Sequence, residues 1–429
     1  MTSSQKVEVC YVSRVEGQGA INVEVGTDGE VKRSEFAIFE PMRFFEALLR
    51  GRKFSEVHEI SSRICGICPI THQITALRAV ENAYGLEVSE QTRDLRRLMA
   101  LSGWIQSHSL SVFFLTAPDY MGYDGVVSMA ADHRAVAEMS LRLKKLGNDI
   151  GEVVGGRAIH PISMVVGGFT KVPSRADLQP FERRLEEALE DMESAAELLA
   201  GFDYPRIGEA SELVAISNPD EYAINEGRMV STEGLDVAEE DYRTQIIEEQ
   251  VNHSNAKQSK VKGRDVFMVG PLARVVLNGE KLSGRARKLR SEIGFDGDSR
   301  DPFMNIKARA VEISHALEES LDIIGKLRVD VAEQPARPHV GVPCQGAALT
   351  EAPRGLLYHA YGFDKTGVVT GSDIVPPTAH NSAHVEVSLR RLAGQGVTDG
   401  EDLRHRCEML VRAYDPCISC SVHSIYGGS

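Results

Sequence analysis

The chain has 429 residues, 42% of them hydrophobic, and its formal net charge of −14 disfavours nucleic acid or an anionic membrane surface as a partner. No unbroken apolar run approaches the roughly 20 residues of a membrane span, and residues 1–6 lack the apolar stretch of a signal peptide. Seven cysteines without disulfide-framework spacing fit a reducing compartment, so we expect a cytoplasmic protein without a membrane span.

The first elements along the chain are strands. Alternating apolar positions predict strands over residues 20–25 and 31–39, joined by a turn at Asp28-Gly29. The pattern then becomes helical, and residues 72–84 predict the first helix.

Two long helices are predicted farther along. Residues 175–200 begin with a capping-box-like Ser174-x-x-Asp177 and repeat apolar residues at steps of three and four, with charged residues on a solvent face. A second such helix is predicted over about residues 303–327. Residues 262–300 and 333–345 favour turns, and residues 215–265 favour mixed strands and loops. We therefore predict a mainly α-helical fold with α+β portions, a long-helix bundle plus an N-terminal antiparallel sheet.

Two Cys-x-x-Cys pairs lie near opposite ends of the chain, each followed within about one helical turn by a histidine: Cys65 and Cys68 with His72, and Cys417 and Cys420 with His423. One metal bound by both pairs would clamp the two ends together. We therefore expect residues 1–423 to form a single interwoven domain, whose N- and C-terminal segments meet at a buried metal site.

Three interpretations of these pairs compete. A redox-active dithiol at a helix N-terminus would explain the first pair but not the second. A structural zinc ion closed by four thiolates is the commoner meaning of this ligand spacing. Two thiolate pairs can also surround a catalytic nickel or iron centre, with the histidines supporting the ligands or binding another ion.

The residues around the pairs resemble the two signature segments of the nickel-iron hydrogenase large subunit. The first pair stands in Arg63-Ile-Cys-Gly-Ile-Cys-Pro-Ile-Thr-His72, and the second in Asp415-Pro-Cys-Ile-Ser-Cys-Ser-Val-His423. Further segments are similar to the same family: Arg14-Val15-Glu16-Gly17, Arg43-Phe44-Phe45-Glu46, Glu351-Ala352-Pro353-Arg354-Gly355 and Val375-Pro376-Pro377-Thr378. The resemblance runs from about residue 7 to His423.

This resemblance implies a nickel-iron centre ligated by all four cysteines, whose iron also carries carbon monoxide and cyanide. The resemblance also implies that Arg354 is a fixed cation oriented by Asp415. It implies that Glu16 relays protons from Cys417 and that His72 donates a hydrogen bond to the sulfur of Cys68. Pro376 and Thr378 are implied to lie beside the cyanide ligands, and Glu46 and His423 to bind a magnesium ion. Taken alone, Arg354 would be an ordinary surface arginine and Glu16 a salt-bridge or helix-cap residue.

The chain departs from the family pattern at three places. Ser107 stands where the family often has an aspartate. Pro377 stands at the position of the usual hydrogen-bond donor to cyanide, which leaves Thr378 or a backbone amide to donate. Residues 424–429 follow His423, a tail that a maturation endopeptidase removes in similar proteins once nickel is inserted.

Electrons must leave through partners, because no dinucleotide fingerprint and no further cysteine set for an iron-sulfur cluster is present. The resemblance implies an iron-sulfur small subunit together with flavin-containing NAD(P) diaphorase subunits. Segments such as Ser107–Phe114 and Pro118-Asp119-Tyr120 are similar to the cytoplasmic, bidirectional NAD(P)-linked and sulfhydrogenase branch. The alternatives are a deazaflavin- or heterodisulfide-linked hydrogenase, or a non-catalytic zinc-stapled scaffold related to the quinone-site subunit of complex I, which lacks the four cysteines.

Overall fold

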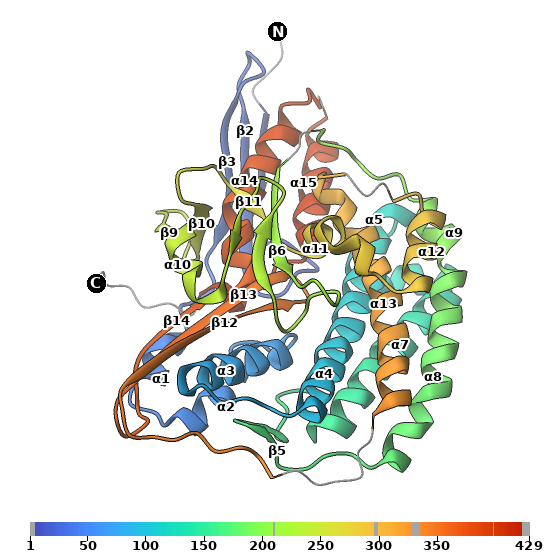
Figure 1. Ribbon diagram of the computed structural model, residues 1–429. Helices are drawn as coiled ribbons and strands as arrows, with labels where there is room; N and C mark the ends of the chain where they lie inside the picture. Colours follow the sequence, from blue (N-terminus) through green and yellow to red (C-terminus); the bar gives the residue numbers. More distant parts are fainter. Residues whose placement is uncertain (1–4, 209–210, 296–298, 328–333, 398, 423–429) are drawn as a thin grey trace.

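The computed structural model describes residues 5–208, 211–295, 299–327, 334–397 and 399–422. Long helices fill one side of the molecule, and small, mostly antiparallel sheets lie on the other side (Figure 1). The predicted mainly α-helical fold with an N-terminal antiparallel sheet is therefore confirmed.

Four long helices form the bundle: α4 (Glu90–Ser109), α7 (Arg134–Gly155), α8 (Arg175–Ser194) and α13 (Asn305–Lys326). α13 packs against α4 and α8, and α4 also packs against α7. The predicted capping box begins α8, where the Ser174 hydroxyl accepts a hydrogen bond from the Asp177 amide at 3.2 Å. The predicted helix over residues 175–200 is interrupted at Ala195, and its last turn is the separate α9 (Ala196–Ala200).

The two predicted amphipathic helices differ in their surroundings. The apolar stripe of α8 is buried and its charged residues face solvent, as expected. By contrast, every residue of α13 from Asn305 to Leu317 is buried, including Arg309 and Glu312. The expectation of a solvent-facing side is therefore wrong for the first half of α13, which is enclosed on all sides by other elements.

The N-terminal sheet consists of β1 (Gln5–Val9), β2 (Gly19–Val25) and β3 (Val31–Ile38), paired antiparallel in that order. Buried and partly exposed residues alternate strictly along β2, because one face of the strand packs on the core. α14 (Pro377–Ala393) packs against β3, so the N-terminal sheet lies directly beside a helix from the last quarter of the chain.

A second antiparallel sheet, which the sequence analysis did not predict, contains β12 (Cys344–Ala352), β13 (Gly355–Phe363) and β14 (Val369–Val375). The first predicted helix is α3 (Pro69–Tyr84), and it packs across β12 and β13. The contact is close at Gly346, where a Cβ atom would lie 2.3 Å from the Ala83 amide nitrogen. This sheet fixes α3, whose N-cap residue is Cys68.

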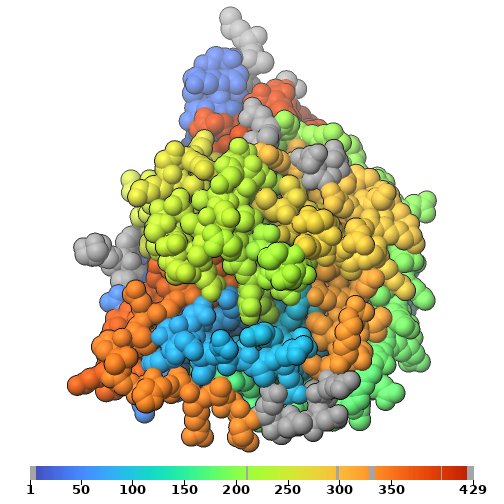
Figure 2. Space-filling view, in the orientation of Figure 1, coloured from blue at the N-terminus to red at the C-terminus, as the bar shows by residue number. Residues whose placement is uncertain are grey.

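Residues 212–268 form short strands, as the pattern of mixed strands and loops predicted, and they cover the middle of the face seen in Figure 2. The prediction of turns over residues 262–300 is wrong, because two short helices lie there: α11 (Pro271–Asn278) and α12 (Gly284–Glu292). The remaining elements are α1 (Phe45–Leu49), α2 (Val57–Ser62), α5 (Ala117–Met121), α6 (Val126–Asp132), β4 (Met164–Val165), β5 (Gly168–Phe169), β6 (Glu212–Ser217), β7 (Arg228–Ser231), β8 (Asp236–Val237), α10 (Tyr242–Gln245), β9 (Ile246–Gln250), β10 (Lys257–Val261), β11 (Phe267–Met268), α11 (Pro271–Asn278), α12 (Gly284–Glu292), α15 (Gly400–Tyr414) and α16 (Ile418–Ser421).

α4 continues through a π-helical turn, Leu110–Thr116, into α5. By length and composition this 32-residue stretch, Glu90–Met121, is apolar enough to cross a membrane, which the search for an unbroken apolar run overlooked. However, 78% of its apolar window is buried inside the protein, the pattern of a core helix.

Candidate metal centre

The four cysteines of the two pairs lie together, as predicted, in one buried cluster where the terminal segments meet. Their sulfur atoms all lie within 4.8 Å of one another, and each residue is at most 6% exposed. The Sγ atoms of Cys65 and Cys417 are 3.1 Å apart, and those of Cys68 and Cys420 are 3.6 Å apart. Each pair contributes one residue to each of these contacts, so the cluster joins the two ends of the chain.

Backbone hydrogen bonds fix the positions of the cysteines in both pairs. The Sγ of Cys65 accepts hydrogen bonds from the Ile67 amide at 3.2 Å and the Cys68 amide at 3.3 Å. Pro69 follows as the first residue of α3, where its missing N–H costs nothing. In the second pair, the Cys417 amide donates to the Thr378 hydroxyl at 2.9 Å.

The electrostatics of the cluster suit a bound cation. Hydrogen bonds from the neighbouring thiols lower the pKa of Cys65, so its thiolate forms readily. Burial raises the pKa of Cys417 and of Cys420, which disfavours further charge in this pocket. Full deprotonation therefore needs compensating positive charge, and thiolates are the ligands that soft metals select. This donor set fits a nickel-iron centre.

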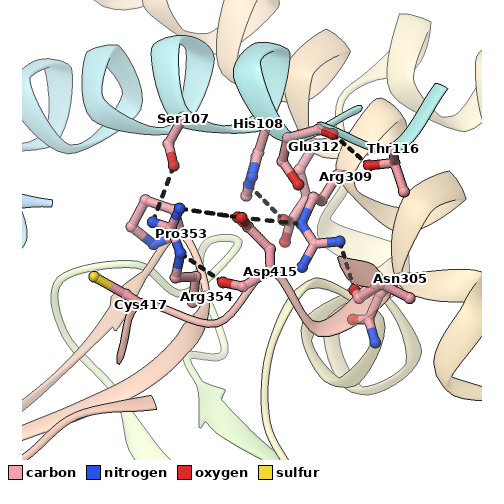
Figure 3. Close-up of polar contacts among 12 residues, drawn as sticks. Ser107, His108, Thr116, Asn305, Arg309, Glu312, Pro353, Arg354, Asp415 and Cys417 are labelled. Atoms are coloured by element: carbon pink, nitrogen blue, oxygen red, sulfur yellow. Dashed lines mark hydrogen bonds and ion pairs between the residues drawn. The ribbon is translucent and has the colours of Figure 1, made fainter. Parts of the chain in front are cut away.

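Arg354 supplies a fixed positive charge beside the cluster (Figure 3). Its Nε donates to the Asp415 carbonyl oxygen at 2.6 Å, and its Nη2 lies 3.1 Å from an oxygen of the Asp415 carboxylate. Although burial opposes the charge, Asp415 and the cysteines hold the pKa of Arg354 above its ordinary value. The third contact of the guanidinium is Ser107, whose Oγ accepts from Nη1 at 3.2 Å. Ser107 thus gives the guanidinium an uncharged hydrogen-bond acceptor.

Glu16 lies against the second cysteine pair. Its backbone forms a parallel bridge with Cys417, and its carboxylate accepts hydrogen bonds from the Ser419 amide at 3.1 Å and the Ser419 hydroxyl at 2.5 Å. The approach is close because Gly17 has a φ of 88°, and a Cβ atom there would lie 2.7 Å from the Cβ of Ile418. Glu16 is partly exposed.

The structure gives contacts for three of the other predicted site residues. The Nδ1 of His72 lies 3.1 Å from the Nε2 of His359, and its predicted bond to the Cys68 sulfur stays a prediction. The Glu46 carboxylate accepts from the Ile374 amide at 2.9 Å, and its role as a magnesium ligand stays a prediction. Pro376 caps the start of α14. His423 and the tail, residues 424–429, lie outside the described residues.

An ionic network behind Arg354 escaped the sequence analysis. Arg274 pairs with Glu312 at 2.6 Å and with Glu351 at 3.0 Å, and all three side chains are fully buried. Burial raises the pKa of Glu351 to about 7, whereas Arg274 outweighs burial and holds the pKa of Glu312 at about 2. His108 lies 3.0 Å from Glu312, and burial lowers its pKa to about 4 (Figure 3). Glu351 and His108 lie within segments that resemble the family, but no pattern in the sequence indicated their pairing.

Comparison with known proteins assigns the family. The profile of nickel-dependent hydrogenases matches residues 43–149 and 215–423. The chain is 37% identical over 425 residues to the alpha subunit of sulfhydrogenase 1 of Pyrococcus furiosus, covering 98% of both chains. The chain belongs to the nickel-dependent hydrogenase family. It is the catalytic large subunit of a nickel-iron hydrogenase, and the four-cysteine cluster is its metal site.

Two further matches agree with this assignment. The large subunit is 28% identical to one component of the F420-non-reducing hydrogenase vhc of Methanococcus voltae, covering 98% of this chain and 95% of the relative. A crystal structure of an NAD+-reducing nickel-iron hydrogenase in the H2-reduced state matches with a TM-score of 0.89, at 27% identity, over 98% of this chain and 99% of that chain. Family membership favours the nickel-iron centre over the zinc and dithiol interpretations.

Replacing any one of the four cluster cysteines by serine is expected to abolish stable nickel binding, because serine removes one of the four thiolate ligands. Metal analysis of the purified protein measures this. Cys407→Ser is the matched control, since Cys407 is equally buried and lies outside the cluster. Retention of nickel in a cluster variant would contradict the ligand assignment.

Arg354→Lys is expected to lower H2 oxidation about 10²-fold while nickel content stays normal, because lysine cannot reach Asp415 and Ser107 together. Arg96→Lys is the control: it breaks a comparably buried pair, with Glu81 at 2.6 Å, that lies outside the site. Equal losses in both variants would mean that the effect is general destabilisation.

Proposed function

We propose that the protein catalyses the reversible reaction H2 = 2 H+ + 2 e− in a cytoplasmic complex, and that its electrons reach NAD(P) through an iron-sulfur small subunit, then through flavin-containing diaphorase subunits. The observation that carries this proposal is the buried four-cysteine cluster with Arg354 and Glu16 against it. The names of its relatives, an NAD+-reducing hydrogenase and a sulfhydrogenase, support this branch.

When bound, the nickel-iron centre supplies the heterolytic cleavage of H2, and carbon monoxide and cyanide would complete the coordination of its iron. Arg354 holds positive charge toward the cluster, and Thr378 or a backbone amide would donate to cyanide. Glu16 accepts the proton released on the Cys417 side and passes it outward, because its carboxylate is partly exposed. Glu46 and His423 would hold a magnesium ion, and a maturation endopeptidase would remove residues 424–429.

The exposure of residues beside Cys65 supports a docked electron acceptor. Cys65 is 1% exposed, yet the adjacent Gly66 is exposed, with no other atom within 4 Å of where its Cβ would lie. His160 lies over this region, with its Nδ1 2.9 Å from the Ser62 carbonyl oxygen. Ile159 and Ile162 beside it are 52% and 48% exposed. Exposed apolar side chains next to a redox centre suit a partner interface, here the iron-sulfur small subunit.

The infrared spectrum of the purified complex tests the centre, and bands of metal-bound carbon monoxide and cyanide are expected. H2-dependent reduction of NAD+, NADP+ and polysulfide, each assayed separately, then tests the acceptor. Cyanide bands with polysulfide reduction alone would retain the hydrogenase and reject the NAD(P) route. An absence of bands in protein that has lost residues 424–429 would reject the proposed centre.

Glu16→Gln is expected to lower H2 oxidation by about 10²- to 10⁴-fold with unchanged nickel content. The amide can still hydrogen-bond to Ser419, but it cannot take up and release a proton as a carboxylate does. Exchange between D2 and water protons reports the same step without an electron acceptor and should fall in parallel. Glu35→Gln is the control, a partly exposed glutamate of β3 bonded to Asn22 at 3.3 Å. Undiminished exchange in Glu16→Gln would exclude the relay.

A further inference from the structure

One buried carboxylate binds two arginines that come from opposite ends of the chain. Asp119 lies in α5, just after the π-helical turn, and its side chain is fully buried. Both of its oxygens lie 3.0 Å from Nη1 of Arg412, near the end of α15. Its Oδ1 also accepts a hydrogen bond from Nη2 of Arg14. Neither the motif analysis nor the proposed function assigns a role to Asp119.

The two arginines hold the segment that carries Glu16. Arg14 precedes Glu16 by two residues, and its Nη1 donates to the Leu115 carbonyl oxygen at 2.7 Å. Arg412 donates to the same segment: Nε to the Ser13 carbonyl oxygen at 3.0 Å and Nη2 to the Ser13 hydroxyl at 3.1 Å. The N-terminal segment, residues 13–16, is therefore fastened to the end of α15 by side chains that converge on Asp119.

The same two chain segments meet again at the cysteines. Five residues beyond Arg412 comes Cys417, and the amides of Ile418 and Ser419 donate to the backbone and side chain of Glu16 at 3.0 and 3.1 Å. Any movement of the 13–16 segment away from α15 would break these two hydrogen bonds. Their geometry thus depends on the contacts around Asp119.

The negative charge of Asp119 is what holds Arg14 and Arg412 close together. Both guanidinium groups bind the same carboxylate, so its negative charge screens their mutual repulsion. A second acid, Glu408, pairs with Arg412 at 2.5 Å. Neutralising Asp119 would remove the carboxylate that Arg14 and Arg412 share, and the repulsion between the two guanidinium groups would then favour their separation.

We propose that Asp119 is a positioning residue for proton transfer, which keeps Glu16 hydrogen-bonded to Ser419 beside Cys417 by binding Arg14 and Arg412 together. The proposal rests on the relay role proposed for Glu16. Asp119 itself does not contact the cysteine cluster in the described structure, so its effect reaches the reaction only through the 13–16 segment.

Hydrogen–deuterium exchange of the assembled, nickel-loaded complex tests the geometry independently of activity. In Asp119→Asn, amides in peptides covering residues 13–19 and 417–421 are expected to exchange faster than in the wild type. Glu81→Gln is the matched control, because Glu81 forms an equally buried bidentate pair with Arg96 outside these segments. Unchanged protection of both peptides in Asp119→Asn would overturn the proposal.

A double-mutant cycle tests the consequence for turnover. Asp119→Asn is expected to lower H2 oxidation about 10- to 100-fold at unchanged nickel content, and combining it with Glu16→Gln should cause no loss beyond that of Glu16→Gln alone. Multiplicative losses would mean that Asp119 does not act through Glu16, and would overturn the proposal. Normal turnover in Glu16→Gln alone would instead reject the relay, while the exchange experiment would still decide the positioning.

Arg14→Lys provides a milder variant if Asp119→Asn fails to assemble, since the Arg14 side chain is 17% exposed. Lysine keeps the charge but cannot reach Leu115 and Asp119 together. It should show the same faster exchange over residues 13–19 and 417–421 and the same lack of additivity with Glu16→Gln. Protection equal to the wild type would contradict the proposal.

Discussion

Four thiol groups within 4.8 Å of one another, in a pocket closed to solvent, set the main electrostatic demand on this fold. Thiolates at such spacing repel each other strongly where water cannot screen them, so positive charge must be held nearby. The protein's own contribution is Arg354, and this buried cation in turn needs Asp415. Asp415 lies near a further buried arginine, Arg309, at 4.0 Å. The buried charges of Arg354, Asp415 and Arg309 thus follow from the cluster.

The same cluster requires the two ends of the chain to meet. Bringing together points separated by nearly 350 residues costs about 5 kcal/mol of chain entropy in the unfolded ensemble. Contacts within the protein offset this cost. The backbone of Glu16 pairs with Cys417, and Arg412 binds Ser13. The ligands are therefore held near one another by hydrogen bonds and ion pairs that do not involve the metal, which keeps the pocket close to its binding geometry.

The sequence alone predicted the clustering of the cysteines and the elements that have one buried and one solvent-facing side. The alternation of β2 and the stripe of α8 predicted those elements, because each has one face in the core and one in water. The sheet over residues 344–375 was missed because its small and aromatic residues, packed against α3, leave no clear alternation.

The buried ion pairs could not be predicted from the sequence either. Glu312 and Arg274 are fully buried, yet a charged residue in a helix ordinarily indicates a solvent face. Their burial depends on mutual pairing across 38 positions, and Asp119 depends on partners 105 and 293 positions away. No local pattern encodes such pairings, so only the resemblance to a family could bring Arg354 and Asp415 into the predicted site.

Two charged residues of the site, Arg14 and Asp415, have a left-handed backbone conformation. Among the described residues, the non-glycine positions with left-handed φ are Arg14, Phe44, His160 and Asp415. Arg14 lies two residues before Glu16, and Asp415 lies two residues before Cys417. Such conformations cost on the order of 1–3 kcal/mol each and persist only where surrounding contacts fix them. Since Ser107 is neutral, Asp415 is the one carboxylate that the described structure places within hydrogen-bond distance of Arg354. The strained turn at Asp415 therefore controls both the direction of the guanidinium and the path of the chain into Cys417, which couples the charge beside the metal to the position of its ligand.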